Sequence, residues 1–147
     1  MEFELITSLS DNLWEKVRKY AAACSWPAGK SLAHDMEADV FTNWERVIIA
    51  HQGEQICGYC TVAEADCIHN VPYTPYIGYI FVGEEHRGNR LSQKLIQFAI
   101  SYLKGIGFND VYLVSDHENL YEKYGFCIVD RTIAPWGSIE KIYHKTI

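Results

Sequence analysis

The feature that most constrains the fold of this chain is an apolar run, a polar loop and an amphipathic segment over residues 76–103. Residues 76–82 are almost continuously apolar and rich in β-branched and aromatic side chains, which predicts a buried strand. Apolar residues then recur at every fourth position, at Leu91, Leu95, Ala99 and Leu103, with polar residues between them. This spacing predicts a helix with one buried face.

The loop between the expected strand and helix carries two arginines, Arg87 and Arg90, beside Gly88 and Asn89. The first turn of a helix has N–H groups without partners inside the helix, and the helix dipole favours negative charge there. The arginine side chains add positive charge at the same place. The pattern therefore predicts a phosphate or pyrophosphate site, and a solvated turn is the alternative.

The loop resembles the acetyl-coenzyme A signature of the GNAT superfamily of N-acetyltransferases, in which Gln/Arg-x-x-Gly-x-Gly/Ala follows a strand. Arg87 and Gly88 match the usual Arg-Gly pair. Three positions depart from the family pattern: Glu84 stands where proline is usual, Arg90 replaces the first signature glycine, and Ser92 replaces the last small residue. Arginine at a glycine position must swing its side chain clear of the phosphates or contact them.

The resemblance implies that acetyl-coenzyme A is the co-substrate and that no metal takes part. Its thioester arm is expected along the end of the strand, and its phosphates at the loop. The cofactor-binding residues that follow are Phe81, Val82, Arg87, Gly88, Asn89, Arg90, Leu91, Ser92 and, further along the chain, Asn119.

Residues 119–126 resemble a second family segment, Leu-Tyr-Glu-Lys-Leu-Gly-Phe. The match places Tyr121 at the family's tyrosine, which implies a catalytic role as the proton donor to the departing thiolate. A phenol can donate at neutral pH because its reference pKa is about 10. The alternative is that Tyr121 only packs a short helix onto the sheet.

A general base cannot be singled out, because the strand over residues 76–82 carries no acidic residue. The candidates are Glu64, Asp66, His69 and His117. The resemblance makes Trp26, His34 and Trp44 candidates for the wall of the acceptor site, and plain packing is the alternative. Four further aromatic residues indicate either an aromatic pocket for a cation or an apolar group, or an ordinary core: Tyr73, Tyr76, Tyr79 and Trp136.

The rest of the chain completes an α/β fold. We expect strands near residues 2–7, 46–50, 55–62, 111–115, 126–132 and 139–144, and helices near 12–24, 31–40 and 119–125. The order β-α-α-β-β-β-α-β-α-β-β predicts a mixed central sheet of about seven strands with helices on both faces. It agrees with the GNAT fold in one domain over residues 1–147.

Composition and net charge restrict the expected classes of ligand and the expected cellular compartment. The formal net charge of −6 argues against nucleic-acid binding and suits a cationic acceptor. No signal peptide or membrane-spanning run is expected, and five cysteines indicate a reducing, cytoplasmic environment. Cys57 and Cys60 are expected on opposite faces of a strand, as structural residues.

Together these features predict an N-acetyltransferase that moves an acetyl group to a primary amine by direct attack in a ternary complex. A small-molecule amine is the expected acceptor. Three points stay open at this stage: a protein or peptide amine as acceptor, a non-catalytic module that binds acetyl-coenzyme A, and assembly as a homodimer.

Overall fold

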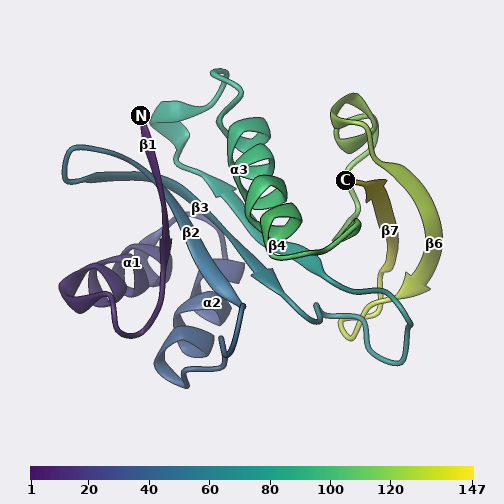
Figure 1. Cartoon of the computed structure of the whole chain (residues 1–147), viewed down its shortest axis with the longest axis horizontal. Coiled ribbons are helices and arrows are strands. Elements are labelled where there is room, and N and C mark those ends of the chain that lie inside the picture. The colour runs from purple at the N-terminus through teal and green to yellow at the C-terminus, as the bar shows by residue number, and fades with distance from the viewer.

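The computed structural model describes the backbone of residues 1–147 and every side chain except that of Asp11. Its seven strands form one mixed sheet in the order β1-β2-β3-β4-β5-β7-β6 (Figure 1). Neighbouring strands are antiparallel except for β4 and β5. The strands are β1 (Glu2–Ile6), β2 (Arg46–Gln52), β3 (Gln55–Ala63), β4 (Tyr76–Val82), β5 (Asp110–Ser115), β6 (Cys127–Ile133) and β7 (Ile139–Thr146).

Helices cover both faces of the sheet, as the sequence predicts (Figure 1). Helices α1 (Asp11–Ala23) and α2 (Ala28–Glu37) lie on one face, and α3 (Leu91–Gly105) lies on the other. Two short 3₁₀ helices, η1 (Glu84–His86) and η2 (Tyr121–Tyr124), follow β4 and β5. None of the helices in the described part of the chain has the length and apolar character needed to cross a membrane.

The apolar stripe of α3 is confirmed as its buried face. Leu91, Leu95, Ala99 and Leu103 are all almost completely buried against β2, β3 and β4. A fully buried leucine side chain stabilises a fold by about 1.5–3 kcal/mol. This packing fixes the first turn of α3 against the end of β4, where the predicted anion site lies.

The start of α2 differs from the sequence prediction. The helix begins at Ala28 and not near residue 31. Proline suits the start of a helix because its fixed φ is already helical and its missing N–H is not needed there. Pro27 has a φ of −57° and directly precedes α2, so the helix begins three residues before the expected position.

The prediction that Cys57 and Cys60 face opposite sides of the sheet is wrong. Both thiols are buried in the core beneath α3. The register between β2 and β3 shifts so that Ala50 pairs with Gly58 and His51 with Ile56, which leaves Cys57 as a bulge. A bulge adds one residue to the strand, so residues three apart can share a face. Both cysteines are free thiols, as a structural role requires.

Strands β4 and β5 separate almost as soon as they meet. They pair at one position, Tyr76 with Tyr112, where the Tyr112 N–H also donates to the Pro75 carbonyl at 2.9 Å. Beyond this point β4 bulges away from regular pairing with β3, and Tyr79 takes a positive φ of 48°. The result is a gap between two parallel strands at their carboxyl ends, where ligands of α/β proteins commonly bind.

Candidate active site

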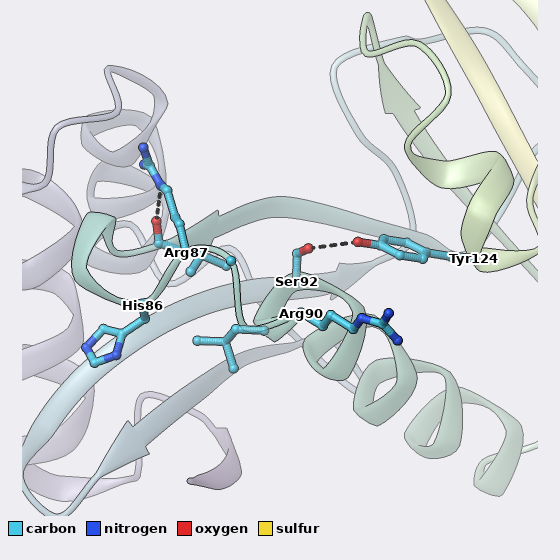
Figure 2. A pocket seen from close by; sticks show the side chains of 8 residues that line it. His86, Arg87, Arg90, Ser92 and Tyr124 are labelled. Carbon is cyan, nitrogen blue, oxygen red and sulfur yellow. Dashed lines mark hydrogen bonds between the residues drawn. The ribbon is translucent and has the colours of Figure 1, made fainter.

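A cavity of about 270 Å³ lies where the loop after β4 enters α3 (Figure 2). Two residues with positive φ turn the chain into the helix, Gly88 at 87° and Arg90 at 58°. The first-turn N–H groups of α3 lack intrahelical partners, and the first two residues of this turn, Leu91 and Ser92, line the same opening. The cavity is lined by Val82, His86, Arg87, Gly88, Arg90, Leu91, Ser92 and Tyr124. We call it the cradle.

Six of the nine residues predicted to bind the cofactor line the cradle: Val82, Arg87, Gly88, Arg90, Leu91 and Ser92. The other three do not. The Phe81 side chain is buried on the opposite face, stacked on Trp26 and Tyr59. Asn89 and Asn119 are exposed and line neither this cavity nor the larger one described below.

The two arginines of the loop point away from each other (Figure 2). Arg87 turns back onto β4, where its Nε donates to the Val82 carbonyl at 3.1 Å and its guanidinium lies 5.8 Å from the Phe81 ring centre. Arg90 is exposed and extends along the start of α3. The Arg87 guanidinium is therefore held against β4 through Nε alone, and both arginines line the cradle.

The free edge of β4 faces the gap. The Gly83 N–H donates to the Cys57 carbonyl at 2.8 Å, and hydrogen bonding alternates along an antiparallel pair. The backbone N–H and C=O of Val82 consequently point away from β3 and toward β5. An extended ligand in the gap would find the Val82 N–H as a partner, while the Val82 carbonyl already accepts from Arg87 Nε.

Tyr121 lies in η2 at the far side of the gap and is 94% buried, with 6% of its surface exposed. Its ring packs against those of Tyr143 and Tyr124 at centroid distances of 5.6 and 6.2 Å. Burial raises the pKa of Tyr121 to about 12, although a polar contact with Ser115 acts in the opposite direction. The hydroxyl therefore stays protonated and is available as a donor.

A second cavity of about 1150 Å³ opens on the face of the sheet that carries α2, and we call it the cleft. It reaches from Tyr121 and Ile80 at the gap to the loop of residues 64–75 and to Trp136. The aromatic residues that the sequence suggested as a pocket all line it: Tyr73, Tyr76, Tyr79 and Trp136. Tyr121 and Tyr124 belong to one 3₁₀ turn, yet Tyr121 lines the cleft and Tyr124 the cradle.

Of the three residues expected on the acceptor wall, Trp26 lines the cleft. His34 is exposed on α2 and does not line it. Trp44 packs on the α3 side, with its ring 4.9 Å from that of Phe108 and its carbonyl accepting from the Tyr102 hydroxyl at 2.7 Å. The expectation is thus wrong for His34 and Trp44.

The cleft is strongly acidic. Six carboxylates line it: Asp35, Glu45, Glu64, Asp66, Asp116 and Glu140. Among the residues that the structure describes, its lining contains no lysine or arginine. A concave site lined by charge of one sign concentrates ligands of the opposite sign.

Asp66 stands apart from the other candidate bases. Glu64, His69 and His117 also line the cleft but are exposed, whereas Asp66 is partly buried against β4. Its Oδ1 accepts from the Cys67 N–H at 2.6 Å, and burial raises the pKa of its carboxyl group. Its Oδ2 lies 2.8 Å from where a β-carbon on Gly78 would stand, so glycine makes this approach possible.

Three residues of the cleft were not found from the sequence: Asp35, Gly78 and Glu140. Asp35 accepts from the Tyr79 hydroxyl at 2.9 Å and so ties α2 to the β4 bulge. Glu140 had a usable signal, since strand alternation puts it in phase with Ile142, which is fully buried. A charged residue on the buried side of a strand is a candidate for function.

Comparison with known proteins identifies the family. Residues 13–126 match the model of the acetyltransferase (GNAT) family. By sequence, no curated protein matches the chain. Three solved structures have the same fold: an aminoglycoside 6'-N-acetyltransferase in complex with coenzyme A, a second such enzyme from Enterococcus faecium, and the NatC complex bound to Gag peptide and coenzyme A.

The TM-scores of these three structures are 0.75, 0.74 and 0.68. Their sequence identities are 18%, 16% and 16%, each alignment covers 99% of this chain, and the matched chains are covered to 97%, 97% and 98%. At such identity the structural likeness shows the fold, while the family model shows the ancestry. The chain therefore belongs to the GNAT family of acetyltransferases, enzymes that transfer an acyl group.

Proposed function

We propose that this enzyme transfers the acetyl group of acetyl-coenzyme A to a primary amine of a small cationic molecule. The observation that carries the proposal is the position of the β4–β5 gap, which joins a cradle for phosphates to an acidic, aromatic cleft. Tyr121 lines the cleft, and Tyr124 of the same 3₁₀ turn lines the cradle. Concave sites lined by aromatic groups with a few polar groups are typical of small-molecule binding.

In this proposal the cradle holds the diphosphate of the co-substrate, and the Val82 edge of β4 pairs with its extended arm. The first-turn amides of α3, among them those of Leu91 and Ser92, supply the anion contacts together with the Arg90 guanidinium. The gap then brings the thioester to Tyr121 and the amine from the cleft. Holding both reactants in one geometry is itself a large part of the rate enhancement.

The reaction is direct attack of the amine nitrogen on the thioester carbon. A C–N bond forms, the C–S bond breaks, and the proton lost by nitrogen goes to a base. Tyr121 stabilises the departing thiolate by a hydrogen bond. It keeps its proton, because a phenol with a pKa of about 12 is a weaker acid than a thiol, whose reference pKa is about 8.5.

Asp66 is our proposed base. Its raised pKa makes the carboxylate a better proton acceptor than an exposed aspartate, and its place beside Gly78 puts it next to the β4 bulge. A base acts in its deprotonated form, so kcat should rise with pH as Asp66 ionises. Asp66→Asn should remove this rise, whereas the exposed neighbour Glu64→Gln should keep it.

The proposal is tested first by calorimetric titration of the purified protein with acetyl-coenzyme A, coenzyme A and dephospho-coenzyme A. We expect micromolar dissociation constants, because the cradle supplies both helix amides and a cation. Release of free thiol is then followed with a panel of amines and with peptides. Failure of all three nucleotides to bind would contradict the proposal, and acetylation of peptides alone would redirect it to a protein amine.

Arg90 allows a sharper test of the cradle. Arg90→Ala and Arg90→Gly should both weaken coenzyme A binding about fivefold and reduce its salt dependence, because both remove a cation near phosphate. Arg90→Gly should nevertheless be about 1 kcal/mol more stable than Arg90→Ala, because glycine adopts the left-handed conformation without strain. Titration and chemical denaturation measure the two effects. Equal stability of the two variants would contradict the observed φ.

We also propose that the enzyme works in the cytoplasm. All five cysteines are free thiols in the structure, and such thiols persist in reducing compartments. A homodimer stays a prediction from the family resemblance, and light scattering of the purified protein tests it.

A further inference from the structure

Glu140 has one buried carboxylate oxygen without a partner. The residue lies at the start of β7 and is 94% buried, with 6% of its surface exposed. Its Oε1 accepts from Trp136 Nε1 and from Ser138 Oγ, both at 3.3 Å. Its Oε2 is buried and has no hydrogen-bond partner among the described residues, and Glu140 lines the cleft.

Such an atom calls for a partner that the protein itself does not provide. Buried carboxylates are normally paired with a cation or fully hydrogen-bonded, because leaving one uncompensated strongly disfavours the fold. The Tyr76 hydroxyl repeats the pattern on the same cleft, with 1% of the residue exposed and no partner among the described residues. Two residues that each carry an unpartnered buried polar atom thus line a cavity whose described lining contains no lysine or arginine.

Glu140 and Asp66 reach the cleft from different elements of the fold. Its neighbour Lys141 pairs with Ser115, so Glu140 lies just beyond the carboxyl end of β5. Asp66 lies on the other side, against Gly78 of β4. Cys67 lies near both carboxylates: burial raises the pKa of its thiol to about 12, and the negative charges of Asp66 and Glu140 act in the same direction.

We propose that Glu140 binds a second, non-reacting ammonium group of the acceptor, so that the acceptor is a diamine or polyamine. This inference rests on the proposed function of the same cleft. One amino group lies beside Asp66 and Tyr121, while the other donates to Glu140 Oε2. The Trp136 indole borders the same cleft and donates its N–H to the other oxygen of Glu140.

The probes are α,ω-diaminoalkanes of increasing length, from propane to octane, and spermidine. Each diamine is compared with the monoamine in which a methyl group replaces the second ammonium. Binding is measured by calorimetry in the presence of coenzyme A, so that no turnover is needed. Thiol release with acetyl-coenzyme A is measured separately on the same protein samples.

The test variant is Glu140→Gln, which removes the charge but keeps an oxygen for Trp136 and Ser138. The matched control is Glu64→Gln, which removes one exposed carboxylate from the same cleft. We expect the unaltered enzyme to bind its best diamine at least about tenfold more tightly than the matched monoamine. Glu140→Gln should abolish this difference without weakening monoamine binding, and Glu64→Gln should retain it.

Several results would overturn the inference. They are equal binding of diamine and monoamine, no binding of any amine, equal weakening of both amine classes by Glu140→Gln, or an equal effect of Glu64→Gln. The third result would indicate a role in shaping the β6–β7 turn, and the fourth a diffuse effect of charge. Selective diamine binding without thiol release would instead contradict the proposed acetyl transfer and leave the ammonium site standing.

Discussion

Replacement of Gly29 by alanine is expected to lower the free energy of unfolding by about 3 kcal/mol, the upper range for overpacking a buried contact. Gly29 is buried in α2 where that helix crosses α1. A β-carbon there would overlap the backbone carbonyl of Ala21 and stand 2.6 Å from Cys24 Sγ. Backbone cannot swing aside as a side chain can, so the two helices must separate. Chemical denaturation measures the loss.

Gly105 provides a matched control for this substitution. It is the last residue of α3, is exposed, and has nothing within 4 Å of the place where its β-carbon would stand. Gly105→Ala should therefore stabilise the protein by about 0.5 kcal/mol, because alanine is the better helix former. A loss below about 1 kcal/mol in Gly29→Ala would show that the helices can separate cheaply.

Tyr121→Phe should lower kcat about 100-fold, the effect of removing one donor to a charge that develops in the transition state. The change removes the hydroxyl and leaves the ring contacts with Tyr143 and Tyr124 in place. Coenzyme A affinity and stability should change little. The measurement is steady-state thiol release together with calorimetric titration of the same variant.

Tyr124→Phe is the control for Tyr121→Phe. Its hydroxyl contacts Ser92 Oγ at 3.2 Å in the cradle, so its loss should affect coenzyme A binding before it affects kcat. Since burial raises the pKa of Tyr121 to about 12, the unaltered enzyme should show no loss of activity from its ionisation below about pH 10. Equal kcat in Tyr121→Phe and the unaltered enzyme would contradict the donor role.

The elements that could be predicted from the sequence are those with a strong local period. The α3 stripe recurs every four residues, and β4 is an uninterrupted apolar run, so their types and order follow directly. The sheet also follows, because the connection from β4 through α3 to β5 forces the two strands to be parallel. Two local predictions were wrong, because a bulge places Cys57 and Cys60 on one face of the sheet and α2 begins directly after Pro27.

The cradle could be predicted because its residues are close together in the sequence, whereas the cleft could not because its residues are far apart. The cradle arises from one loop and one helix turn, so its residues can be read in order. The cleft joins α2, the loop of residues 64–75, β4 and β7, and no short-range pattern brings Asp66 and Glu140 together. Solvent exposure, which separates Asp66 from Glu64, is likewise a property of the folded chain.

Because β4 and β5 pair only between Tyr76 and Tyr112, the sheet consists of two parts, β1–β4 and β5–β7, that are connected by one pair of residues. A ligand in the gap would replace part of the missing strand pairing, because its amide groups could form hydrogen bonds with free backbone groups of β4. A ligand in the gap would therefore stiffen the joint between the two parts of the sheet.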